Sequence, residues 1–414
     1  MGKTTTKASS RLGTLNLYNQ SISVPTLVNF ELTTDLTIGA NNQGTGVIDK
    51  KGLVFNKTYK FLAKLAGSKN SIESTKIVWV IRYTSPSTSQ NKLMALKAII
   101  KGPEFELDLK DKHKDMAGCE IEISCHMQAR PKKSVSNKYF VHNRFMYFDS
   151  GKVLNQVKQR MMYPWMIDQG ASSLCGMACL YYILIQRSSS LYKKIAIELH
   201  RTGIYELSNG YTIKPKSSMY DIKPEDSDYK NMKMDEVDWI VLASTRSSES
   251  NLRYDGIETG SFDQLGAVNW MGMLTRMCKE VAGYSSAKSN DLGLLDVGKT
   301  IINKRNFSID KLFEMDKKYK SGKKIIMMIQ PKMIDDKKGD RDINSIHWVV
   351  YEGGLQFFDG DGRNVASDSL HIGNVKFDIF TWGYNPKNSP RIISKQGISA
   401  TNFSNNYYGH IEVK

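Results

Sequence analysis

One apolar segment constrains the fold of this chain more than any other. Leu174–Ile185 is an unbroken apolar run, and it is preceded by Ser172 and Ser173, whose type favours the N-cap of a helix. The run is long enough to predict a buried helix, although an apolar run alone is also compatible with a buried strand. The rest of the chain must therefore supply the surfaces that cover this segment.

The predicted helix carries a cysteine, Cys175, in its first turn. Unpaired backbone N–H groups and the positive end of the helix dipole favour a thiolate at that position. Gln169 lies six residues upstream, where its amide is placed to donate a hydrogen bond to an oxyanion beside the sulfur. A cysteine nucleophile also needs a base, and His347 supplies one at the start of the β-like run Ile346–Tyr351.

The pattern Gln169-Gly170 followed by Cys175-Gly176 and an apolar helix resembles the nucleophile segment of the papain-like cysteine peptidases. Leu174–Leu180 is most similar to the bacteriocin-processing branch, since the aromatic residue that follows the cysteine in papain and the cathepsins is missing. The resemblance covers residues 160–414. It implies Cys175 as nucleophile, His347 as general base and Gln169 as oxyanion donor.

The third member of the catalytic group is less clearly marked. A carboxylate or amide is expected to orient the imidazole of His347. If Gly353-Gly354 forms a tight hairpin, the returning strand brings Asp359 close to His347, provided that a bulge or strand end lets it reach. Asp378 on the next β-like run, or no third residue, are the alternatives, because Phe380 stands where a papain-like enzyme has Asn. Asp359 is the preferred residue.

Short β-like runs separated by turn-rich clusters fill residues 13–150. Ile121–Cys125 alternates apolar and polar side chains, and several such strands predict a β-sandwich. We therefore expect an α+β protein, with the β-sandwich in front of a papain-like cysteine protease domain. The expected divisions are a mobile N-terminus (1–12), the sandwich (13–150), a linker (151–165) and the peptidase domain (166–414).

Within the second domain, periodic apolar positions predict further elements. We expect helices over Leu191–Thr202, Met234–Thr245 and Trp270–Ala282, and a central strand over Lys323–Pro331. Residues 245–265 are polar and are predicted to form either a lid over the substrate cleft or an ordinary surface loop.

The N-terminal domain contains no catalytic pattern, but three stretches carry a second resemblance: Lys76–Trp79, Gly118–Ile123 and His142–Phe145. They are similar to modules joined to toxin-like domains in bacterial contractile-injection (type VI-like) effectors. This resemblance implies a docking or delivery role, with a secretion-apparatus component and an immunity protein as partners. It also implies synthesis in the bacterial cytoplasm, followed by secretion or injection into a target cell.

Composition excludes several other classes. The net charge of +16 is scattered over the chain, with no basic motif interleaved with aromatic residues, so we expect no nucleic-acid partner. No apolar stretch is long enough for a transmembrane helix, and no apolar segment of a secretory signal follows Met1. The five cysteines form no CxxC pair and no zinc spacing, so we expect free thiols, no metal and no cofactor.

These patterns predict a cysteine hydrolase effector that cleaves a peptide or amide bond through a Cys–His pair. Its substrate would be a protein or peptidoglycan, and a peptidoglycan amide hydrolase on the same site is the alternative enzyme. A non-catalytic binding protein with a degenerate protease-like domain is the alternative from another class.

Overall fold

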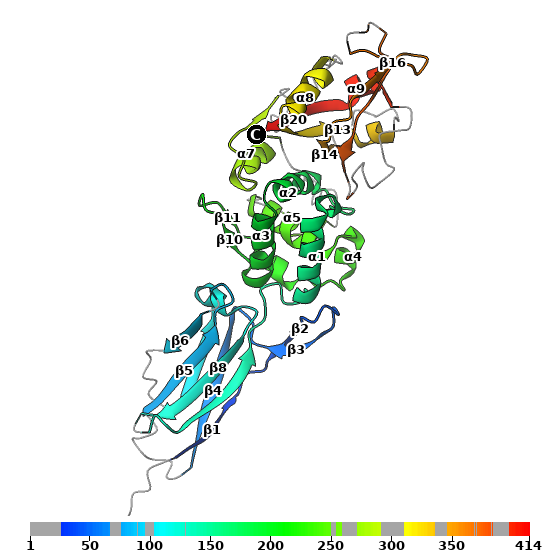
Figure 1. The fold of residues 1–414 in the computed structure, drawn as a ribbon. Helices are drawn as coiled ribbons and strands as arrows, with labels where there is room; N and C mark the ends of the chain where they lie inside the picture. The colour runs from blue at the N-terminus through cyan, green and yellow to red at the C-terminus, as the bar shows by residue number, and fades with distance from the viewer. Residues whose placement is uncertain are drawn as a thin grey trace, which may run out of the picture.

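The computed structural model describes residues 26–66, 76–88, 90–95, 103–128, 130–249, 254–258, 271–290, 310–335, 346–367, 369, 371–381, 383 and 397–414. The chain is a mixed α+β protein whose sheets are antiparallel. Figure 1 shows the N-terminal sheets at one end, a group of helices in the middle and the C-terminal sheets at the other end.

The N-terminal part contains two antiparallel sheets. One has the order β1-β4-β7 and the other β6-β5-β8-β9, and β2 and β3 form a separate hairpin. Every second side chain is buried along β7, and Ile121, Ile123, Cys125 and Met127 are buried in the same way along β8, as expected for strands with one face on a core. The elements are β1 (Thr26–Leu32), β2 (Thr37–Ala40), β3 (Ile48–Gly52), β4 (Lys57–Ala66), β5 (Ile77–Thr84), β6 (Asn91–Ala95), β7 (Glu104–Leu109), η2 (Asp111–Met116), β8 (Glu120–Met127) and β9 (Ser134–Phe140).

An aromatic cluster joins the two N-terminal sheets. Trp79 of β5 stacks on Phe105 of β7 with ring centroids 5.3 Å apart, and it meets the edge of Phe30 of β1 at 5.2 Å. All three rings belong to one buried cluster. Burial of rings of this size dominates the packing energy of a small β core.

The middle of the molecule is built around α2, the helix expected from the apolar run. Every residue from Cys175 to Ile185 is buried, so this helix is covered on all sides. The surrounding elements include the helices expected over 191–202, 234–245 and 270–282. They are α1 (Ser150–Met162), η3 (Pro164–Met166), α2 (Cys175–Arg187), α3 (Ser189–Thr202), β10 (Tyr205–Glu206), β11 (Thr212–Ile213), η4 (Ser217–Asp221), α4 (Ser227–Met232), α5 (Glu236–Glu249) and α7 (Met271–Glu280).

Residues 151–165, expected to form a linker, instead contain helix α1. Asp149 caps this helix by accepting hydrogen bonds from the N–H groups of Gly151 and Lys152. Val153 and Val157, four residues apart, lie on one face and are buried in the same core as α2. Most of the expected linker is therefore a packed helix, while the division into domains stays a prediction.

A five-stranded antiparallel sheet of order β12-β20-β13-β14-β18 forms the C-terminal part, beside a smaller sheet of order β16-β15-β17-β19. The strand expected over 323–331 is β13, and it lies at the centre of the larger sheet. The elements are β12 (Ala287–Ser289), α8 (Asp310–Lys320), β13 (Lys324–Ile329), η5 (Pro331–Asp335), β14 (His347–Tyr351), β15 (Gln356–Phe358), β16 (Asn364–Val365), β17 (Asn374–Lys376), β18 (Ile379–Phe380), β19 (Ile398–Ser399), α9 (Ala400–Asn406) and β20 (Tyr407–Val413).

The expected hairpin between the His347 strand and the Asp359 strand does not form. β14 pairs with β13 and with β18, whereas β15 pairs with β16 and β17 in the smaller sheet. The position beside β14 is occupied by β18, whose Phe380 stacks on Tyr182 of α2 with centroids 3.9 Å apart. This contact between residues far apart in the chain favours β18 over β15 as the neighbour of β14. Among the described helices, none combines the length and apolarity needed to cross a membrane.

Candidate active site

Helix α2 begins at Cys175, one residue after an N-cap, Leu174, that forms no side-chain capping bond. Ser172, one of the two expected cap residues, forms its side-chain hydrogen bonds within the preceding loop instead. Ser172 Oγ donates to the carbonyl of Gln169 (2.7 Å) and accepts from the N–H of Leu174 (3.4 Å). The first N–H groups of the helix therefore remain beside the sulfur of Cys175.

The loop before the helix is fixed by a close contact with the end of α4. The N–H of Ala171 donates to the carbonyl of Met232 at 2.7 Å. Gly170 has φ +56°, and a Cβ at this position would approach the same carbonyl oxygen to 2.1 Å, so only glycine fits. Gln169 Nε2 donates to Ser172 O at 2.8 Å. That bond uses one of the two amide hydrogens, which leaves a second one on the expected oxyanion donor.

The thiol of Cys175 is 7% exposed and lies close to backbone N–H groups. Burial raises its pKa to about 11, although the N–H groups of Trp348, Gly176 and Cys175 itself act to lower it. The contact with Trp348 brings the sulfur to the start of β14, next to the residue predicted as its base.

His347 is the first residue of β14 and is 4% exposed. Trp348 belongs to the buried cluster around α2, whereas Val349 belongs to the cluster on the other face of the sheet. His347 pairs with Ile329, which lies in that second cluster, and its Nε2 is 2.6 Å from Thr381 Oγ1. Burial lowers the pKa of His347 to about 3. The thiol therefore lies beside the main chain that follows His347, and the imidazole is held by Thr381.

The directions of the two pKa shifts indicate which charge states burial favours for Cys175 and His347. Burial raises the pKa of the Cys175 thiol and lowers the pKa of the His347 imidazole, so it disfavours the charged form of each group. The described conformation therefore favours the neutral forms over a thiolate–imidazolium pair.

The two aspartates weighed for the third position lie elsewhere. Asp359 occupies a turn of the smaller sheet, where its Oδ1 accepts from the N–H groups of Asp361 and Arg363. Among the described residues it forms no hydrogen bond with His347, because its strand does not pair with β14. Asp378 lies beside the turn at Gly354, where a Cβ would meet its Oδ2 at 2.7 Å. This is the opposite end of β14 from His347.

Thr381 was missed by the sequence analysis. It stands directly after Phe380, on the run that was compared with the papain-like Asn segment. Its hydroxyl both donates and accepts, so it can hold either tautomer of the ring. The only local signal for Thr381 was its position directly after Phe380, which stands where a papain-like enzyme has Asn.

A carboxylate, Glu258, also contacts the loop in front of the helix. Both of its oxygens lie 2.9 Å from the N–H of Ser173, and its charge further raises the pKa of Cys175, beyond the larger effect of burial. Glu258 lies within the predicted lid, residues 245–265. Of that stretch, residues 250–253 and 259–265 lie outside the described residues.

No group of three His, Cys, Asp or Glu side chains within the described ranges is arranged to hold a metal ion. All five cysteines are free. Comparisons with protein-family models, curated proteins and solved structures find no match to this chain. The function must therefore be argued from the residues themselves.

Proposed function

We propose that this chain is a cysteine hydrolase that resembles the papain-like peptidases and cleaves peptide or amide bonds. The observation that supports it best is the position of Cys175. Its sulfur lies at the N-terminus of a buried helix, among the N–H groups of Cys175 and Gly176, and it also meets the N–H of the residue after His347. This environment stabilises negative charge once water or substrate relieves the burial.

Catalysis requires the imidazole to approach the thiol. His347 Nε2 lies 2.6 Å from Thr381 Oγ1, and a nitrogen of the His347 ring would receive the thiol proton. The Cβ of His347 leaves β14 on the face opposite to that of Trp348, so the ring reaches the sulfur only if the backbone at this first residue of the strand also turns. Thr381 is the positioning residue in this proposal, in place of Asp359.

The reaction then follows acyl-transfer chemistry. The thiolate of Cys175 attacks the carbonyl carbon, and the oxyanion is held by the backbone N–H of Cys175 and the second amide hydrogen of Gln169. The His347 imidazolium gives its proton to the leaving amine, and a thioester remains. The neutral imidazole then takes a proton from water, and the hydroxide attacks the thioester carbon. The C–S bond breaks, a carboxylic acid leaves, and His347 returns the proton to the Cys175 thiolate.

The N-terminal sheets form a β-sandwich that docks or delivers the enzyme in this proposal. The chain would act as a secreted or injected effector, with a secretion-apparatus component as the partner of the sandwich and an immunity protein as the partner of the hydrolase. This part rests on the resemblance alone.

The experiment that tests the proposal compares Cys175→Ala and His347→Ala with the wild type on two substrates, denatured protein and purified peptidoglycan sacculi. We expect cleavage of one of them to fall by about 10³-fold or more in both variants. Cys179→Ala, on the same helix, is the matched control and should keep activity. Cleavage that survives Cys175→Ala would rule out the mechanism.

A second candidate is a non-catalytic binding protein on the same frame. The neutral thiol and imidazole favour it, because a working pair normally carries charge. It predicts no hydrolysis of either substrate by the wild type, and alkylation of Cys175 that is unchanged by His347→Ala at every pH.

A further inference from the structure

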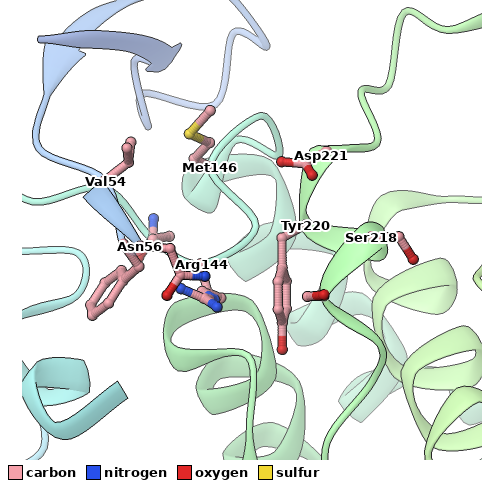
Figure 2. Close-up of a pocket in the computed structure, with 10 residues that line it drawn as sticks. Val54, Asn56, Arg144, Met146, Ser218, Tyr220 and Asp221 are labelled. Atoms are coloured by element: carbon pink, nitrogen blue, oxygen red, sulfur yellow. The ribbon is translucent and has the colours of Figure 1, made fainter. Parts of the chain in front are cut away.

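A pocket of about 390 Å³ lies where the N-terminal sheets meet the helices (Figure 2). Its lining residues come from the segments 54–56, 143–146 and 217–221, of which Phe145 and Met219 do not line it, and none of the lining residues belongs to the Cys175 site. The volume falls within the range typical of small-molecule sites. Two parts of the chain that are far apart in sequence thus build one concave surface.

The cation in this pocket is Arg144, whose side chain is only 10% exposed. Its guanidinium carbon lies 4.4 Å from the ring centroid of Tyr220 and 5.3 Å from that of Phe55, so the two rings contact its faces. Its ion pair within the described chain is with Asp111, at 3.8 Å, and Asp111 is itself 64% exposed and shared with Lys214. At 3.8 Å this contact is too long for a hydrogen bond. The Tyr220 hydroxyl also bonds to the guanidinium, and the remaining N–H donors of the planar fork keep capacity for an anion.

A carboxylate, Asp221, lines the same pocket and is exposed. In the described parts of the chain it forms no ion pair with Arg144 or with any other cation. One cation and one anion therefore share the pocket without neutralising each other, and the apolar side chains of Val54 and Met146 form another part of the wall (Figure 2). A ligand that carries both charges satisfies both groups, whereas a doubly charged anion would be repelled by Asp221.

We propose that this pocket binds a small zwitterion of amino-acid or dipeptide size. Its carboxylate meets the fork of Arg144, its ammonium meets Asp221, and an apolar side chain packs against Val54 and Met146. This site is separate from the proposed hydrolase and does not depend on it.

The test measures binding of the dipeptide Ala-Leu to the full chain by calorimetry, with C-terminally amidated Ala-Leu, N-acetylated Ala-Leu and inorganic phosphate as comparison ligands. We expect the free dipeptide to bind most tightly, amidation to abolish binding, and acetylation to weaken it. Arg144→Gln should abolish binding, while Arg82→Gln, an exposed arginine on β5, should leave it unchanged. Asp221→Asn should remove the difference between free and acetylated dipeptide, and Asp49→Asn is its control.

Arg144→Gln also loses its stacking, so its fold is checked by circular dichroism. If it fails to fold, Ser218→Trp fills the pocket while keeping Arg144, and the same loss of binding is expected. The proposal is overturned if millimolar Ala-Leu releases no heat, if the amidated dipeptide binds as well as the free one, or if phosphate competes equally.

Discussion

At the scale of single residues, the chemistry of this chain depends on what surrounds Cys175. Its backbone N–H neighbours favour a thiolate, whereas burial and the charge of Glu258 oppose one, and burial is the largest effect. The helix N-terminus is therefore not sufficient to activate the thiol in the described conformation. For Cys175 to become a thiolate, water or substrate must reach the sulfur and reduce the effect of burial on its pKa.

Glu258→Gln provides a direct measure of that balance. Removing a negative charge near the sulfur lowers the pKa of the thiol, while the amide oxygen can still accept from the N–H of Ser173. We expect iodoacetamide to label Cys175 faster at pH 8, by up to about tenfold. Asp255→Asn, an exposed residue of the same segment, should leave the rate unchanged. An unchanged rate in Glu258→Gln would mean that its charge does not reach the thiol.

A second residue-scale prediction concerns the buried arginine that anchors the loop of Gln169. Arg160 is 2% exposed and binds Asp238, which is fully buried and accepts from the N–H of Asp168. Arg160→Met leaves that carboxylate without a cation, so we expect a loss of about 3–5 kcal/mol in the free energy of unfolding. Urea denaturation at pH 7 measures this.

The matched control for Arg160 is Asp235→Asn. Asp235 binds the same guanidinium but is 51% exposed, so its loss should cost only about 0–1 kcal/mol. Equal effects of the two substitutions would contradict the importance of burial.

At the scale of elements, the sequence predicted most of the helices that depend on local periodicity, with α1 as the exception. Helices α3, α5 and α7 follow from apolar positions at helical spacing, and β13 follows from its β-branched and apolar run. The strand partner of β14 could not be predicted, because it depends on the stacking of Phe380 on Tyr182, which is almost 200 residues away in the chain. Glu258 was missed as a neighbour of Cys175 for the same reason.

Asp149 allows an element-scale prediction about pH. It caps α1 through Gly151 and Lys152 and also accepts from Gly44 and Gly46 of the β2–β3 loop. Burial alone would raise the pKa of this carboxyl, but the four N–H donors together hold it below its usual value. Asp149→Asn should therefore cost about 1–2 kcal/mol at pH 7.

The pH dependence follows from the sign of that shift. A carboxylate with a lowered pKa in the folded state stabilises the protein above its unfolded pKa of about 4, and this stabilisation is lost as the pH falls through the folded value. The difference between wild type and Asp149→Asn in urea midpoint should be constant from pH 5 to 7 and shrink below pH 4. A difference that stayed constant at pH 3 would contradict the role of the charge.

At the scale of the whole molecule, the N-terminal sheets are attached to the helices by polar contacts that no local sequence pattern predicts. Arg201 of α3 donates from Nη1 to the carbonyls of Asp115 and Ala117, each at 3.2 Å, and its own carbonyl accepts from the N–H of Arg144. These bonds link the two parts of the chain that line the pocket of Arg144 and Asp221. The sequence predicted two units, but their contact depends on residues far apart in the chain and could not be predicted.

Arg201→Gln tests whether this contact couples the two units. The carbonyls of Asp115 and Ala117 lose a charged donor, which costs about 1–3 kcal/mol at the junction. We expect faster hydrogen exchange at residues 116–118 and 143–145, with no change in α5. Lys193→Gln, an exposed position on the same helix, should leave both regions unchanged.

Because Arg144 is held by the same junction, Arg201→Gln should also weaken binding of Ala-Leu. Faster exchange without weaker binding would mean that the pocket does not depend on the docked arrangement of the two units.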